Sequence, residues 1–181
     1  TDYLHQIRLI LEEIQAGDKI LEIGVGTRFT SNYLKSKGYD VITMDIDPDK
    51  QPDIVGNIVE MELSETYDYI LAFEVFEHMP FRDFSEVLQK LNRHCRKRLL
   101  ISVPRNEKVW LSLQAELPGR KSFGFRITTR RRKIISKHHH WEVDHPPVSR
   151  KVLEQAFQSA GFRIQTMKKV DSLYFYVLTN K

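Results

Sequence analysis

The sequence predicts an α/β fold, a doubly wound and mostly parallel sheet with helices on both faces. Short apolar runs alternate with amphipathic helical segments over residues 1–104, the pattern of parallel strands joined by crossover helices. The runs at 19–24 and 67–73 are almost wholly apolar, as expected of strands that helices cover on both sides. Because 181 residues can bury one substantial core, we expect a single domain over residues 1–181.

The spacing of apolar residues predicts each element in turn. A first amphipathic helix is expected to end before Gly17, and a second helix to stop at Gly38, a residue type common just after helix ends. The inner face of the first helix should hold Leu4, Ile7, Leu11 and Ile14. The other elements expected up to Pro104 are strands at 19–24, 40–45, 53–56, 67–73 and 98–104 and helices at 28–36 and 81–95.

After residue 148 the alternation resumes. Ser149 is a typical helix-capping residue, and Gly161 is placed to end the helix that follows. Two closing strands are expected at 162–170 and 172–180, with a tight turn between them. The inner face of the helix should hold Val152, Leu153, Ala156, Phe157 and Ala160.

Residues 105–148 are the one large insertion in this pattern. One short helix is expected at 107–116, and the rest shows no sustained period. Long insertions in compact domains are more often binding loops or lids than spacers. We therefore expect a basic segment on the substrate side of the domain.

The positive charge is concentrated in this insertion. Residues 117–141 hold eight lysines and arginines and no acid, while the whole chain carries +4, so the remainder carries −4. The stretch from Arg120 to Lys137, with Phe123 and Phe125 interleaved, suits a nucleic-acid backbone, one phosphate or carboxylate of a small substrate, or a solvated loop. The solvated loop is the favoured reading, and nucleic acid is possible but not favoured as a partner.

Cysteine usage indicates a cytoplasmic protein. Cys95, the one cysteine, cannot form an internal disulfide and lies at helical spacing among apolar residues, which favours a packing role in a reducing compartment. No apolar run approaches the ~20 residues of a membrane helix. The opening stretch carries Glu12 and Glu13 where a secretion signal would be apolar, so no membrane partner is expected.

The glycine turn after the first strand does not suit a dinucleotide. The dinucleotide motif G-x-G-x-x-G places a third glycine for close packing of strand and helix. Gly24 and Gly26 are present, but Phe29 stands at the third position. A dehydrogenase would also need a substrate domain for which the chain has no room.

Four motifs in order resemble the class I S-adenosylmethionine-dependent methyltransferases, in particular the small-molecule, methyltransferase type 11-like members. They are the acid and G-x-G of 22–26, Asp45 at the tip of the second strand, Gly56-Asn57-Ile58, and the strand and loop YDYILAFEVFEHM at 67–79. The final helix, Gly-Phe and two strands also match. The resemblance implies a seven-stranded Rossmann-like sheet with an antiparallel last strand and S-adenosyl-L-methionine as cofactor.

The resemblance also assigns cofactor contacts. Glu22 would meet the cofactor ammonium, Asp45 the two ribose hydroxyls, and Asn57 the adenine amino group. A carboxylate suits the ribose because its two oxygens accept two donors at once. The sulfonium would face backbone carbonyls near Phe73 and Glu74. The implied cofactor-binding residues are Glu22, Gly24, Gly26, Asp45, Ile46, Asn57, Ile58 and Phe73.

Two positions depart from the family pattern. Asn57 replaces the usual aspartate, and Arg28 stands where many members have another glycine. Arg28 either strains the turn or reaches the methionine carboxylate of the cofactor, and the sequence leaves both possibilities open.

His78 and His140 are the candidate catalytic residues. In this fold the loop after the fourth strand faces the methyl group, so His78 is placed to act as a base, although a helix-capping role is equally compatible. Glu77 would orient His78 or bind the cofactor. Within HHHWEVDH, residues 138–145, we expect either a lid of His140, Trp141 and Glu142 over the substrate or a solvated loop. A metal site is not expected, because adjacent histidines rarely converge on one ion.

These observations predict a methyltransferase acting on an oxygen, nitrogen or carbon nucleophile of a small, anionic molecule. The alternatives are an RNA methyltransferase guided by the basic insertion, and a non-catalytic domain that keeps the fold to bind a partner. Enzymes that methylate adenine or cytosine amino groups are excluded, since they carry an Asn/Asp-Pro-Pro-aromatic loop where this chain has Phe73-Glu74-Val75-Phe76.

Overall fold

The computed structural model describes residues 2–116, 122–129, 133–134 and 136–180. Its elements, in chain order, are α1 (Asp2–Leu11), β1 (Lys19–Ile23), α2 (Phe29–Ser36), β2 (Asp40–Asp45), η1 (Pro48–Lys50), β3 (Ile54–Val55), β4 (Tyr67–Phe73), η2 (Phe76–His78), α3 (Phe81–His94), β5 (Cys95–Pro104), β6 (Lys108–Glu116), β7 (Ser122–Thr129), α4 (Arg150–Ser159), β8 (Phe162–Val170) and β9 (Leu173–Asn180). Most expected elements of the sheet and its helices are present near their predicted bounds.

The predicted fold class is confirmed. Seven strands form one sheet in the order β3-β2-β1-β4-β5-β9-β8. β1 to β5 pair in parallel, whereas β9 pairs antiparallel with both β5 and β8. The strand order reverses direction between β1 and β4, and in open α/β sheets ligands bind beyond the carboxyl ends of the strands at such a point.

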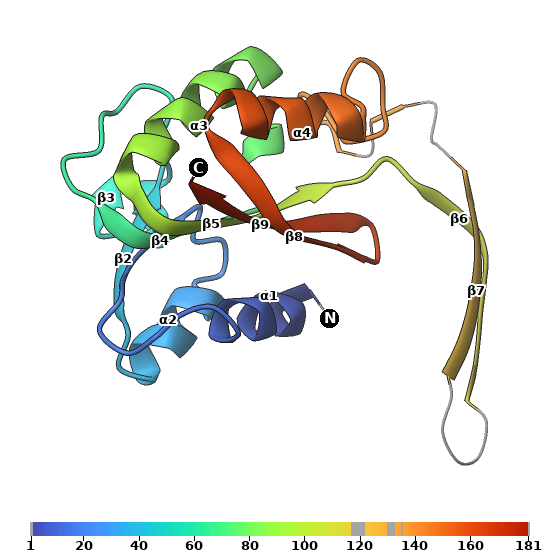
Figure 1. The fold of residues 1–181 in the computed structure, drawn as a ribbon, viewed down its shortest axis with the longest axis horizontal. Coiled ribbons are helices and arrows are strands. Elements are labelled where there is room, and N and C mark those ends of the chain that lie inside the picture. The colour runs from blue at the N-terminus through green and yellow to red at the C-terminus, as the bar shows by residue number, and fades with distance from the viewer. Residues whose placement is uncertain (1, 117–121, 130–132, 135, 181) are drawn as a thin grey trace.

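Helices cover both faces of this sheet. Figure 1 shows α1 and α2 on one face and α3 and α4 on the other. Side chains along a strand point alternately to opposite faces, and β4 shows this directly, because Ile70 belongs to the core under α3 and α4 while Tyr69 and Leu71 belong to the core under α1 and α2. Cys95 is buried and unpaired in the first of these cores. None of the helices in the described ranges has the length and apolar character needed to cross a membrane.

The first helix differs from its prediction. It ends at Leu11, and Leu4 and Leu11 are 72% and 41% exposed. The other two predicted residues, Ile7 and Ile14, are buried, and so are Leu9 and Ile10. Several apolar residues at neighbouring positions allowed more than one inner face, and packing against the sheet selected a face that leaves out Leu4 and Leu11.

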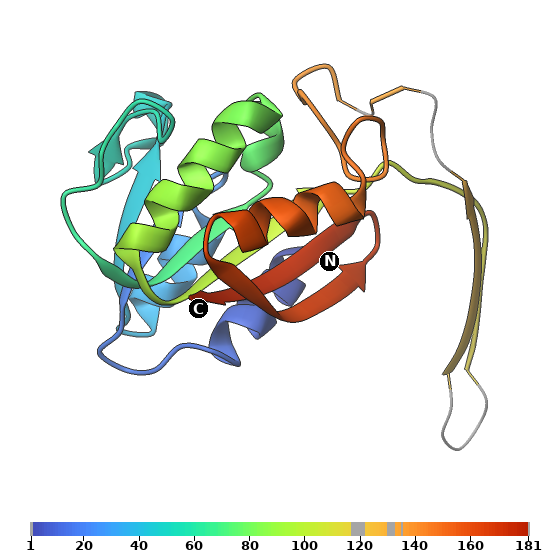
Figure 2. The ribbon, with the colours of Figure 1, turned by 45° about the horizontal axis from the view of Figure 1, so that its top comes forward.

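The helix predicted at 107–116 is wrong, because this stretch is the strand β6. It pairs antiparallel with β7 in a separate two-stranded sheet, and Figure 1 and Figure 2 both show this hairpin reaching away from the main sheet. Its sequence holds a period-two pattern, Val109, Leu111, Leu113 and Ala115 alternating with other residues, which indicates a strand. The described apolar side chains of the hairpin that are exposed are Trp110, Leu111, Leu113 and Ile127.

The last part of the insertion packs back on the domain. Trp141, Val143 and Val148 belong to the core under α3 and α4. Val143 also exchanges backbone hydrogen bonds with this side of the sheet, donating to the Pro104 carbonyl at 2.9 Å and accepting from Asn106 N at 2.7 Å. Residues 141–148 are therefore a structural part of the domain, and they position the histidines before them.

Candidate active site

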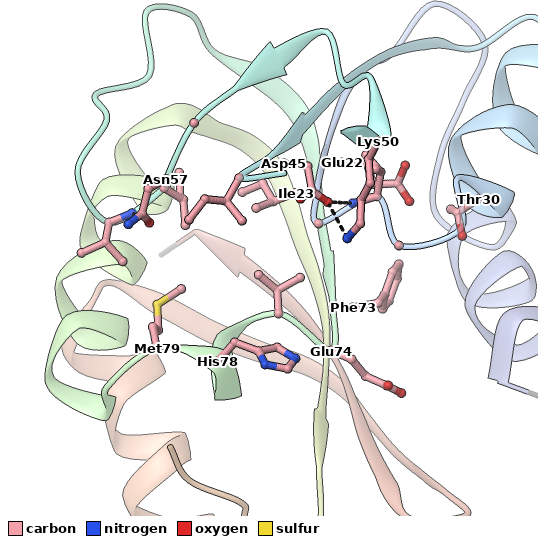
Figure 3. A pocket seen from close by; sticks show the side chains of 18 of the residues that line it. Glu22, Ile23, Thr30, Asp45, Lys50, Asn57, Phe73, Glu74, His78 and Met79 are labelled. Carbon is pink, nitrogen blue, oxygen red and sulfur yellow. Dashed lines mark hydrogen bonds and ion pairs between the residues drawn. The ribbon is translucent and has the colours of Figure 1, made fainter. Parts of the chain in front are cut away.

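A cavity of about 970 Å³ opens at the carboxyl ends of β1, β2 and β4. This volume lies at the upper end of the roughly 300–1,000 Å³ typical of ligand sites. In Figure 3, Glu22, Asp45 and Lys50 gather on one side of the cavity, across from His78. All the predicted cofactor-binding residues line it: Glu22, Gly24, Gly26, Asp45, Ile46, Asn57, Ile58 and Phe73.

The glycine turn forms one wall of the cavity and requires its glycines. Gly24 has φ +76°, a left-handed conformation that side chains rarely adopt, and a Cβ there would lie 2.5 Å from Val75 Cγ2. Gly26 also has a positive φ, +51°. Gly24 is therefore required both by its backbone conformation and by the close packing of Val75.

Asp45 ties the turn to the tip of β2. Its side chain is buried, and Oδ2 accepts a hydrogen bond from the Val25 N–H at 2.9 Å, while Oδ1 accepts one from the Asp47 N–H at 2.9 Å. Lys50 Nζ lies 3.4 Å from Oδ2. A carboxylate offers about four lone-pair positions, so Asp45 keeps accepting capacity toward the cavity.

Glu22 is the buried acid of the site. It is 4% exposed, and its Oε2 has no hydrogen-bond partner among the described residues. Burial raises the pKa of this carboxyl to about 7. A bound cation would supply the missing partner and favour the charged carboxylate.

Arg28 and Phe29 leave the cavity free. The Arg28 backbone is left-handed, with φ 63°, and its guanidinium donates to the carbonyl oxygens of Lys50, at 2.6 Å, and Gln51. Phe29 packs its ring against Tyr3, with centroids 5.1 Å apart. Of the two possibilities for Arg28, the strained turn is the one the structure shows.

Asn57 lines the cavity but already has partners. Its Oδ1 accepts from the Val59 N–H at 3.0 Å, and its Nδ2 donates to Glu60 Oε1 at 3.0 Å. The amide thus holds the loop after β3, and the neighbouring Ile58 is buried.

Of the two candidate catalytic histidines, His78 lines the cavity. Its Nδ1 lies 3.2 Å from the carbonyl oxygen of His138, and burial lowers the pKa of its imidazole below the ordinary value. His140 has an exposed side chain, and its backbone N–H donates to the Glu77 carbonyl at 2.7 Å. The histidine ring that contacts His78 is that of His139, edge-on with centroids 5.1 Å apart.

The predicted substrate residues Glu77, Trp141 and Glu142 are buried beside the cavity and are not among its lining residues. Burial raises the pKa of Glu77 to about 8. Trp141 Nε1 donates to the Met79 carbonyl at 3.0 Å. Glu142 lies 3.0 Å from His139 Nδ1 through Oε1 and accepts from Asn106 Nδ2 at 2.7 Å through Oε2.

Sequence reasoning missed two residues of the site. Lys50 forms an ion pair with Asp45 and lines the cavity. No local sequence motif indicates that this lysine belongs to the site. His139 was overlooked in favour of its neighbour, although Glu142 stands three residues later, a spacing at which helical or turn residues meet.

Of the basic residues, Arg120, Lys121 and Arg130 to Arg132 lie outside the described residues, while Lys133 and Lys137 are described and exposed.

Comparisons with known proteins agree with this geometry. The model of a methyltransferase domain family matches residues 1–167, whereas no curated protein matches the sequence. A solved S-adenosylmethionine-dependent methyltransferase from Clostridium acetobutylicum has 11% identity and a TM-score of 0.68, covering 99% of this chain and 92% of that one. A TehB-like enzyme from Corynebacterium glutamicum has 18% identity and a TM-score of 0.67, covering 97% and 87%.

A third solved structure was determined with its cofactor. The glycopeptide N-methyltransferase MtfA, complexed with S-adenosyl-L-methionine, has 12% identity and a TM-score of 0.65, and the match covers 97% of this chain and 93% of that one. At such identities these similarities show a shared fold.

Proposed function

The chain belongs to the methyltransferase domain family, and we propose that it moves a methyl group from S-adenosyl-L-methionine to an oxygen, nitrogen or carbon nucleophile of a small, anionic molecule. One observation carries this proposal. Two buried carboxylates, Glu22 and Asp45, line the same cavity beside a glycine turn that admits no Cβ at Gly24.

The residues present fit the cofactor. The unpartnered Oε2 of Glu22 suits the cofactor ammonium, and the remaining lone pairs of Asp45 suit the ribose hydroxyls. Asn57 and Ile58 would flank the adenine, with Ile46 against the nucleoside and the Phe73 backbone near the sulfonium. When bound, the cofactor supplies an electrophilic methyl group on a sulfonium.

The task of the protein is then mainly to position the reactants. Holding two reactants in line contributes about 7–11 kcal/mol in well-oriented reactions. A carboxylate in contact with the sulfonium would stabilise the ground state more than the transition state, because the charge disperses during transfer. We therefore assign Glu22 to the ammonium of the cofactor and Asp45 to its ribose hydroxyls rather than to its sulfur.

The acceptor would enter at the His78 end of the cavity. Burial lowers the pKa of His78, which favours its neutral imidazole. Its Nδ1 faces a carbonyl oxygen, so Nε2 is the nitrogen placed to take a proton. Removal of the acceptor proton by such a base typically contributes 10²–10⁴-fold. In its simplest role, His78 acts as this base.

The predicted residues His140, Trp141 and Glu142 would stabilise the position of His78. Trp141 and His140 attach residues 138–142 to η2 through the Met79 and Glu77 carbonyls, and Glu142 holds His139.

The proposal of an anionic acceptor draws on the basic segment from Arg120 to Lys137. An RNA acceptor and a non-catalytic role stay predictions, and the first depends largely on residues outside the described ranges.

Transfer of labelled methyl groups tests the proposal. The protein is incubated with methyl-labelled S-adenosyl-L-methionine and, in separate reactions, a small-molecule extract and total RNA. We expect label in small molecules that an anion exchanger retains, and loss of that label in Asp45→Ala. Label in RNA alone would instead support the RNA alternative, and no transfer to either would contradict the proposed activity.

A further inference from the structure

We propose that the acceptor end of the cavity binds one divalent transition-metal ion through Glu77, His78 and His139. One ligand atom from each residue lies within 4.8 Å of those of the other two. Imidazole nitrogens with a carboxylate oxygen are a donor set typical of zinc and of other first-row divalent metals. The two histidines come from different parts of the chain, η2 and the segment before Trp141, so the cluster is made by the fold.

The second nitrogen of each histidine is already engaged as a metal ligand requires. His78 Nδ1 lies 3.2 Å from the His138 carbonyl oxygen, and His139 Nδ1 lies 3.0 Å from Glu142 Oε1. Each Nδ1 therefore carries the proton, and each Nε2 keeps a lone pair. Metal-binding histidines almost always donate their other N–H to a carbonyl or carboxylate in this way, which fixes the tautomer and orients the ring.

Glu77 supplies an independent observation. Its side chain is 1% exposed, and its Oε2 has no hydrogen-bond partner among the described residues. A buried carboxylate oxygen without a partner is costly, and the cost falls when a cation binds to it.

The fold holds the ligands in register. His140 N–H donates to the Glu77 carbonyl at 2.7 Å, and Trp141 Nε1 donates to the Met79 carbonyl at 3.0 Å, so the two residues after His139 are fixed to η2 and to the residue that follows it. Asn106 Nδ2 fixes the far oxygen of Glu142 at 2.7 Å. This support is what a preformed metal site needs, because loosely held ligands bind weakly.

The site would serve the acceptor, and this part of the inference rests on the proposed function. His78 lines the cavity, and three protein ligands leave a coordination position open, as in catalytic metal sites. An acceptor oxygen bound there loses its proton more readily, because the ion stabilises the resulting anion. A lone pair given to the ion cannot take a proton, so in the metal-bound protein the ion replaces His78 as the activating group.

Metal binding is measured by calorimetry on the full chain after treatment with a chelator, with Zn²⁺ and Co²⁺ as probes, and by the visible absorption of Co²⁺. We expect one ion per chain. His78→Ala, His139→Ala and Glu77→Gln should each weaken binding at least tenfold, as losses of ligands do. His138→Ala and His140→Ala are matched controls, because they remove neighbouring imidazoles and keep the backbone contacts, and they should leave the affinity within about twofold.

Two results would overturn the metal site. One is the absence of stoichiometric binding, and the other is equal weakening by the control variants, which would show only loose binding by the histidine run. S-adenosyl-L-methionine binding, measured on the same samples with and without metal, separates this failure from failure of the proposed function. If the cofactor binds but no ion does, the metal site is wrong and His78 remains the base.

Discussion

The carboxylate of Asp45 accepts a hydrogen bond from the Val25 N–H at 2.9 Å, which joins the tip of β2 to the glycine turn after β1. One side chain therefore both shapes the turn and faces the cavity beside it. The turn lacks the third glycine of a dinucleotide motif. Its conformation is stabilised by the hydrogen bond to Asp45 and by the contacts of Arg28 with the Lys50 and Gln51 carbonyls.

Substitution of Gly24 tests how closely the turn is packed. Gly24→Ala should lower the free energy of unfolding by about 2–3 kcal/mol, because the positive φ costs roughly 1–2 kcal/mol and the new Cβ would lie 2.5 Å from Val75 Cγ2. Gly38→Ala is the control, since it shares a positive φ but has nothing within 4 Å. Chemical denaturation measures both variants, and equal losses would contradict the predicted clash.

The buried carboxyl of Glu22 predicts that the stability of the protein falls as pH rises. Its pKa is about 7 in the folded protein, against 4.5 as the ordinary value, so the folded state binds the proton more tightly. The group therefore stabilises the fold fully below pH 4.5, and this contribution, on the order of 3 kcal/mol, is lost as pH rises through 7. The melting temperature, measured from pH 5 to 8, should fall more steeply with rising pH for the natural protein than for Glu22→Gln.

The same carboxylate predicts pH-dependent cofactor affinity. A cofactor ammonium favours charged Glu22, so affinity should fall up to tenfold per unit as pH drops below about 7, while α-amino groups stay mostly charged up to roughly pH 7.5. In Glu22→Gln, affinity should be at least tenfold weaker at pH 7.5 and nearly independent of pH. Parallel pH profiles in the two proteins would argue against this contact.

Arg28 should matter for stability more than for the cofactor. Arg28→Ala removes hydrogen bonds to the Lys50 and Gln51 carbonyls and should cost about 1–2 kcal/mol in unfolding free energy. Cofactor affinity should change less than about threefold, because the guanidinium does not line the cavity. A folded variant that has lost cofactor binding would instead show that Arg28 reaches the methionine carboxylate.

The hairpin should be separable from the fold. Lys108 and Thr129 are paired residues at its base, so residues 109–128 can be replaced by a short glycine linker. We expect the melting temperature and the cofactor affinity to stay nearly unchanged, while transfer to the anionic acceptor falls. Full transfer activity without the hairpin would show that this part of the insertion takes no part in acceptor binding.

The sheet was predictable because its central strands are buried on both faces and alternate with amphipathic helices. The start of α4 was predictable as well, since the Ser149 side chain accepts from the Val152 N–H at 3.3 Å as the capping pattern predicts. The hairpin was missed although Val109, Leu111, Leu113 and Ala115 alternate with other residues, because a short apolar run outside the core can be read as a helix or as a strand. Leu4 and Leu11 were misplaced because several apolar residues could have formed the inner face of α1.

The two ends of the site were predictable to different degrees. The cofactor end depends on motifs local in sequence, such as the turn at 22–26 and Asp45 at the end of its strand. The acceptor end depends on tertiary contacts. His139 meets His78 because Trp141 and Glu142, which follow it, are buried and hold it through contacts with Met79 and with its own ring. Sequence reasoning named His140, whose side chain is exposed, because packing decides which of the adjacent histidines turns toward His78.

Calorimetry with S-adenosyl-L-methionine and its demethylated product tests the central claim most directly. The natural protein should bind both with a stoichiometry of one, and Asp45→Ala should weaken binding by about 100-fold, as expected when buried charge-assisted hydrogen bonds are lost. Asp49→Ala, which removes an exposed carboxylate nearby, should bind as the natural protein does. Absence of binding in the folded natural protein, or undiminished binding in folded Asp45→Ala, would contradict the account.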